Sequence, residues 1–80
     1  MRTVHVLYFA LLREQRGLSE ECVATRALTP RELYSELATL HGFSLGPAIL
    51  RVVVNESFSP WDTNLADGDS VAFIPPVAGG

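Results

Sequence analysis

Hydrophobic and polar positions along the chain predict strands toward both ends and one amphipathic helix between them. Residues 4–10 (VHVLYFA) are rich in β-branched and aromatic side chains on both faces, which is typical of a central strand. Residues 21–28 are more polar and predict a second strand nearer the sheet edge. A turn at residues 16–19 separates the two segments, so we expect them to pair as an antiparallel hairpin.

The clearest local signal is a helix that begins after Thr29. Thr29 is placed as N-cap, Pro30 occupies the first helical position, and Glu32 completes a capping box. Apolar side chains then recur at helical spacing and predict one buried stripe, made by Leu33, Tyr34, Leu37, Ala38 and Leu40. We expect the helix to end at residues 41–42 with a glycine cap.

The second half of the chain predicts three more strands. They span residues 49–55, a short piece at 57–58 after a turn, and residues 70–74. The run Ala-Asp-Gly-Asp at 66–69 is a strong turn signal before the last strand. Pro75 ends that strand because proline cannot donate to a sheet ladder.

This order of elements predicts an α+β fold with one mixed sheet and one main helix packed across one face. A crossover through the helix allows the last strand to lie parallel beside the first. That arrangement is the ubiquitin-like β-grasp. We expect residues 1–74 to form this domain and residues 75–80 to form an extended, flexible C-terminal tail that ends in Gly-Gly.

Composition excludes several classes of function. The net charge is −3, which argues against nucleic-acid binding. No apolar run approaches the roughly 20 residues of a membrane helix, and no signal peptide is apparent, so we expect a soluble cytoplasmic protein. All six basic residues are arginine, so the chain has no side-chain amine.

The side chains predict no catalytic or metal centre within this chain. Cys22 is the only cysteine, and we interpret it as a buried, inert thiol rather than a sulfur acceptor. His5 and His41 are far apart in sequence and show neither metal-ligand spacing nor a Cys/His dyad. No Gly-rich phosphate loop is present.

The sequence PPVAGG at residues 75–80 is the candidate reactive segment. Six extended residues reach about 20 Å, and Pro75-Pro76 favours a stiff stem that projects from the sheet. Gly79 and Gly80 have no Cβ, so the tip can enter a narrow channel. A terminal carboxylate, with a pKa of roughly 3.5, is an anion at neutral pH and needs activation before a nucleophile can attack it.

Three stretches resemble the small subunit of molybdopterin synthase, a family of ubiquitin-like sulfur carriers: FALLRE at 9–14, VN at 54–55 and DGDSVAFIPPVAGG at 67–80. The resemblance implies that an adenylating enzyme of the ubiquitin-activating type uses ATP to activate Gly80. A sulfur-donor system then converts the terminus to a thiocarboxylate. Its sulfur goes to cyclic pyranopterin monophosphate, which yields the dithiolene of molybdopterin. No permanently bound cofactor is implied.

The resemblance also implies a large subunit that supplies the catalytic side chains, in a heterotetrameric sulfurtransferase complex. In this chain Gly80 would carry the reacting group, with Gly79 beside it. Ile74 stands where the family often has an aromatic residue. The implied partner interface consists of Phe9, Arg13, Phe58, Ile74, Pro75, Pro76, Val77 and Ala78.

Three other functions stay open from the sequence. A thiamine-type sulfur carrier shares the fold and the Gly-Gly end, although such chains are typically shorter. A ubiquitin-like modifier would join lysines of target proteins through Gly80. A plain binding module would use its sheet to dock a partner and would not need Gly79-Gly80.

Overall fold

The computed structural model describes residues 1–76 of the 80-residue chain. The predicted site residues Val77, Ala78, Gly79 and Gly80 lie outside the described residues. The elements in chain order are β1 (Arg2–Tyr8), α1 (Ala10–Arg16), β2 (Glu20–Thr25), α2 (Pro30–His41), the 3₁₀ helix η1 (Pro47–Ile49), β3 (Arg51–Val54), β4 (Ser57–Ser59) and β5 (Ser70–Ile74).

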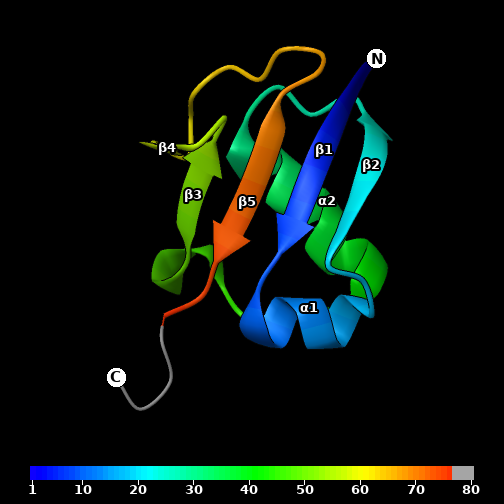
Figure 1. The fold of residues 1–80 in the computed structure, drawn as a ribbon, viewed down its shortest axis with the longest axis vertical. Helices are drawn as coiled ribbons and strands as arrows, with labels where there is room; N and C mark the ends of the chain where they lie inside the picture. Colours follow the sequence, from blue (N-terminus) through cyan, green and yellow to red (C-terminus); the bar gives the residue numbers. More distant parts are fainter. Residues whose placement is uncertain (77–80) are drawn as a thin grey trace.

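The five strands form one mixed sheet in the order β2-β1-β5-β3-β4 (Figure 1). β1 and β5 pair in parallel at its centre, with His5 opposite Ser70 and Tyr8 opposite Phe73. The other neighbouring strands are antiparallel. The crossover between β1 and β5 contains α2, so the predicted ubiquitin-like β-grasp is confirmed.

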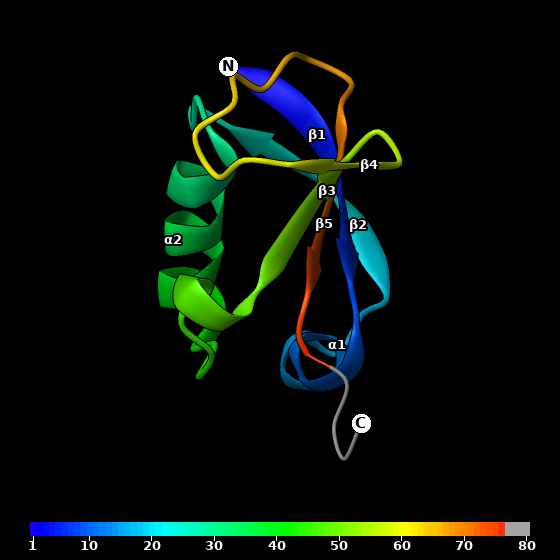
Figure 2. The same ribbon diagram turned by 90° about the vertical axis from the view of Figure 1, so that its left-hand side faces the viewer.

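α2 packs across one face of the sheet, and no helix of the described residues covers the opposite face (Figure 2). Inward-facing residues of β1, β3 and β5 alternate along each strand and meet the buried stripe of α2. The largest side chains in this core include Tyr8, Tyr34 and Phe73, which are nearly inaccessible to solvent. Trp61 is half-buried and packs against the core, with its ring stacked on Phe73.

The start of α2 confirms the predicted N-cap and corrects the predicted capping box. The Thr29 hydroxyl accepts a hydrogen bond from the Glu32 backbone N–H at 3.2 Å. The Glu32 carboxylate, however, accepts from the N–H of Leu28 at 3.0 Å rather than from Thr29. Gly42 ends the helix in the left-handed region, with φ 69°.

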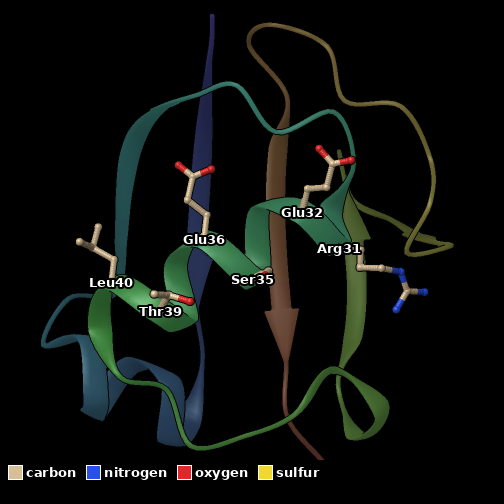
Figure 3. Close-up of a pocket in the computed structure, with 6 residues that line it drawn as sticks. All are labelled: Arg31, Glu32, Ser35, Glu36, Thr39 and Leu40. Atoms are coloured by element: carbon tan, nitrogen blue, oxygen red, sulfur yellow. The ribbon is translucent and has the colours of Figure 1, made fainter.

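The buried stripe of α2 is shorter than predicted, because Leu40 is 72% exposed. Leu33, Tyr34 and Leu37 face the sheet. Leu40 lies at the margin of the stripe in the last helical turn, near Glu36 on the outward side (Figure 3). The helical spacing alone therefore assigned one solvent-facing leucine to the core.

The helix α1 was not predicted from the sequence, and the first strand is shorter at its C-terminal end than predicted. β1 ends at Tyr8, and residues 10–16 form a helix instead of continuing the strand. Ala10 adopts φ 52°, which turns the chain out of the sheet, and Leu12 is fully buried. β1 and β2 still pair antiparallel as predicted, but a helix capped by Gly17 connects them rather than a tight turn.

Other strand limits also differ from the predictions. β2 ends at Thr25, not at residue 28, and the Thr25 hydroxyl accepts from the Ala27 N–H at 3.0 Å where the chain leaves the sheet. β3 begins at Arg51 because the residues before it form η1. The two-residue turn at 55–56 is confirmed, with both residues at positive φ, as in a tight hairpin.

Candidate functional site

The uncovered face of the sheet carries an apolar row that runs across four strands. The registers place Leu7 of β1 opposite Ala72 of β5, Ala72 opposite Val53 of β3, and Val53 opposite Phe58 of β4. Cross-strand neighbours share one face, so these four side chains form a continuous row, in which Ala72 is buried and Leu7 and Val53 are half-buried. Phe58 is 77% exposed and ends the row at the sheet edge.

Phe9 and Ile74 connect two hollows of this surface. The first, which we call the open-face hollow, lies over the centre of the sheet and includes Leu7, Val53 and Ala72. The second, which we call the tail-root groove, lies between α1 and the segment that contains Leu45 and Ile49. Both hollows include Phe9 and Ile74, so the apolar face continues to the point where β5 ends.

The structure brings most of the described interface candidates together. The tail-root groove is lined by Phe9, Arg13, Ile74, Pro75 and Pro76. Phe9 is 41% exposed and Ile74 is half-buried, while Arg13 and Pro76 are exposed. Pro75 is buried, so the packing of the body extends one residue past β5.

Phe58 lies apart from the tail-root groove but is linked to it through Pro76. A further groove on the β3 side includes Phe58, Arg51, Ile49 and Pro76. Because Pro76 lines both grooves, the candidate interface surrounds the base of the tail on two sides. Arg51 was not among the predicted site residues, and its register opposite Ile74 places it beside this groove.

A half-buried ion pair holds α1 against the sheet. The Arg16 guanidinium donates two hydrogen bonds to the Glu21 carboxylate on β2, at 2.8 and 2.7 Å. The Tyr8 hydroxyl donates to the same carboxylate at 2.7 Å. These bonds connect β1, α1 and β2, and thereby position Arg13 and Phe9 at the tail-root groove.

The environment of this cluster shifts the protonation equilibria of both acidic groups. The Arg16 guanidinium, with the Tyr8 hydroxyl, lowers the pKa of Glu21 to about 2. Burial and the neighbouring Glu21 carboxylate raise the pKa of Tyr8 well above its ordinary value. Glu21 is therefore charged and Tyr8 is a neutral donor at neutral pH.

A second contact fixes the other side of α1. The amide of Gln15 donates to the Ser44 hydroxyl at 2.8 Å and accepts from the Ser44 N–H at 3.2 Å. Ser44 precedes Leu45, which lines the tail-root groove. Both walls of the groove are thus joined by side-chain hydrogen bonds.

Asn55 and the Asp-Gly-Asp turn have a structural role at the opposite end of the sheet. The Asn55 amide donates to Asp69 and accepts from the Ser70 N–H, each at 2.9 Å. Asp69 also accepts from the Ala66 N–H, which with Asn55 lowers its pKa. Asp67 accepts from the Thr3 N–H at 2.7 Å. These bonds fix the start of β5 beside β1.

Cys22 is exposed, which corrects the expectation of a buried thiol. It lies on β2 opposite His5, and the His5 ring is bonded to Glu20 at 2.9 Å. Within residues 1–76, no group of three or more His, Cys, Asp or Glu side chains is placed to hold a metal ion. None of the helices in this part of the chain is long and apolar enough to cross a membrane.

A shallow depression on the outer side of α2 is separate from the candidate site. Its lining side chains all come from α2, and they include Arg31, Glu36 and Leu40 (Figure 3). Arg31 is bonded to Asp62 at 3.0 Å, and Glu36 accepts from the Thr25 hydroxyl at 2.9 Å. The polar groups at this surface therefore serve to attach α2 to its neighbours.

Comparison with known proteins identifies the family. The ThiS family matches residues 6–80, which include the candidate interface and the Gly79-Gly80 end. The chain belongs to the ThiS family. A relative from Escherichia coli (strain K12), named molybdopterin synthase sulfur carrier subunit, is 36% identical over 80 residues, covering 96% of this chain and 99% of the relative.

Solved structures agree with the ThiS-family fold. SAMP1, the small archaeal modifier protein 1, from Haloferax volcanii is 25% identical, with a TM-score of 0.81 over 98% of this chain and 99% of that one. A chain in the complex of subunits 1 and 2 of molybdopterin-converting factor from Helicobacter pylori is 24% identical, with a TM-score of 0.67 over 98% and 99% of the two chains. The second likeness shows the fold alone.

The Glu21 ion pair makes the stability of this ThiS-family chain depend on acidity. The pKa of Glu21 falls from an ordinary 4.5 to about 2 on folding, so its contribution is complete above about pH 4.5. The contribution is lost as the pH falls from 4.5 toward 2. In Glu21→Gln we expect lower stability at neutral pH and a shallower loss across this range, measured by urea unfolding at several pH values.

The matched control is Glu14→Gln, which removes an exposed carboxylate of α1 that makes no ion pair within the described residues. It should retain the wild-type dependence on pH. Equal pH dependence in Glu21→Gln and the wild type would contradict the assigned role of Glu21.

Proposed function

We propose that this chain is the sulfur-carrier small subunit of a molybdopterin synthase. The observation that carries the proposal is the match to a relative of that name over nearly the whole length of both chains. The family match extends through residue 80 and so includes the Gly-Gly end. The described site supports the same function, because an apolar surface surrounds the base of the tail.

The proposed chemistry takes place at the carboxylate of Gly80, and Gly79 gives it access to a narrow channel. Attack of that carboxylate on the α-phosphorus of ATP in an adenylating enzyme would release pyrophosphate and form an acyl-adenylate. A sulfide equivalent from a donor system would then displace AMP and leave a thiocarboxylate. That sulfur would be transferred to cyclic pyranopterin monophosphate. ATP is a co-substrate of the activating enzyme in this proposal, and the carrier holds no resident cofactor.

The large subunit of the synthase is the proposed partner of the open face and tail root. The tail candidates Val77 and Ala78 would enter its channel together with the terminal glycines. The large subunit would supply the acids and bases, in a cytoplasmic heterotetramer. The match to a relative named molybdopterin synthase sulfur carrier subunit supports a partner subunit of the same synthase.

A second candidate function is protein modification through Gly80. The likeness to SAMP1, a small archaeal modifier protein, favours it. The two functions share activation by adenylation and differ in the acceptor. A modifier forms covalent adducts with lysines of many proteins, whereas a carrier passes sulfur to a small molecule.

Sulfur loading tests the first proposal directly. After incubation with the adenylating enzyme, ATP and a sulfur donor, the intact mass should increase by the difference between one sulfur and one oxygen atom, located at Gly80 by fragmentation. A reaction without ATP is the control. An unchanged mass in the complete reaction refutes the carrier function, and abundant higher-mass adducts in a cell lysate favour the modifier instead.

Phe58 tests the proposed interface. Phe58→Asp should abolish binding to the large subunit, measured by titration calorimetry, because it places a charge in an apolar contact surface. Leu40→Asp is the matched control, since Leu40 is 72% exposed on α2 and Phe58 is 77% exposed on the sheet. Both variants should retain the wild-type free energy of unfolding within about 0.5 kcal/mol. Unchanged binding by Phe58→Asp, or its unfolding, would contradict the assignment.

A further inference from the structure

Two arginines lie on opposite sides of the tail root. Arg13 of α1 lines the tail-root groove together with Ile74 and Pro76. Arg51 of β3 is the cross-strand neighbour of Ile74 and lines the groove on the other side of Pro76, together with Phe58. Both arginines are exposed. They come from elements on either side of the end of β5 (Figure 1).

These two arginines differ from those that have a structural partner. Arg16 is bonded to Glu21, and Arg31 to Asp62. Within residues 1–76, Arg13 and Arg51 take part in no ion pair. Glu14 also lines the tail-root groove, but it is paired with neither arginine, so the two positive charges are available at the tail root.

Because Arg51 lies beside the apolar surface, a partner that covers this surface must provide a group that pairs with the guanidinium. Cross-strand neighbours on one sheet face have Cβ atoms roughly 5 Å apart, so a partner that covers Ile74 also removes water from the Arg51 side chain. A guanidinium that loses water without gaining a partner is strongly destabilising. Arg13 lines the tail-root groove beside Pro75 and Pro76, so a partner that covers this groove removes water from the Arg13 side chain as well.

We propose that Arg13 and Arg51 form a tail-root arginine pair that binds carboxylates of the large subunit on both sides of the channel entrance. The inference rests on the proposed function, because it requires a partner that receives the tail. The planar guanidinium favours bidentate contact with a carboxylate. The pair fixes the direction from which the tail enters, while the apolar row supplies contact area.

Charge reversal tests the pair with a control of equal charge. Arg2 and Arg26 also lack an ion pair within the described residues, and they lie at the other end of the sheet, where Arg2 is opposite Thr25. Arg13→Glu/Arg51→Glu and Arg2→Glu/Arg26→Glu change the net charge by the same amount. We would measure Kd for the purified large subunit by calorimetry at low and high salt, after confirming wild-type thermal unfolding of each variant.

The tail-root double variant should weaken binding by at least about 30-fold. Each substitution replaces the attraction between an arginine and a partner carboxylate with a repulsion between two carboxylates, at a site from which water is excluded. The control double variant should weaken it by less than about 3-fold, and only at low salt. Arg51→Lys should weaken binding less than Arg51→Glu, since it keeps the charge but loses the planar fork. Equal weakening by the two double variants would assign the effect to net charge and overturn the proposal, as would wild-type binding by the tail-root variant.

The wild-type chain separates this inference from the proposed function. If it binds the large subunit and acquires sulfur, the proposed function holds, and the double variants then decide the role of the arginine pair. If the wild-type chain neither binds the large subunit nor acquires sulfur, the proposed function fails, and the proposed role of the arginine pair fails with it. Sulfur loading of the tail-root variant adds a second readout, because a variant that still acquires sulfur but does not bind has lost only the large-subunit contact.

Discussion

The parallel pairing of β1 with β5 at the centre of the sheet is the constraint on which the rest of the structure depends. It places the end of β5 beside the end of β1, so the chain leaves the sheet where α1 begins. The Asn55, Asp67 and Asp69 contacts fix one end of this pairing. The opposite end thereby brings Phe9, Ile74 and Pro75 into one groove.

A single main helix leaves one face of the sheet uncovered, and this face is the proposed contact surface. α2 buries one face, while the row from Leu7 to Phe58 stays apolar on the other. An exposed apolar surface of this kind is typical of a contact site rather than of an isolated monomer. Here the surface continues to the tail root, so in the proposed function one partner would contact the folded body and receive the tail together.

Local signals in the sequence predicted the elements with strong local chemistry. The Thr29 cap, the Gly42 cap, the 66–69 turn and the last strand are all confirmed. Their order was enough to predict the β-grasp. α1 was not predicted because Phe9 and Ala10 continue a strand-like pattern, and only the positive φ of Ala10 redirects the chain.

The site was predictable in part. The resemblance placed Phe9, Arg13, Phe58 and Ile74 at an interface, and the structure shows all four at the surface around the tail root. Arg51, which lines a groove with Pro76, was not among the predicted site residues, because a single polar residue in a strand does not reveal its neighbours until the register is known. Cys22 was misjudged for a related reason, since a strand pattern near a sheet edge does not say which face is covered.

In the proposed function, the free carboxylate at Gly80 is the reactive group and the folded body only presents it. The most direct measurement adds one alanine after Gly80 and follows both sulfur loading and thermal unfolding. We expect the elongated chain to unfold at the wild-type temperature, to acquire no sulfur and to support no cofactor synthesis. An elongated chain that supports cofactor synthesis without being trimmed would contradict this expectation.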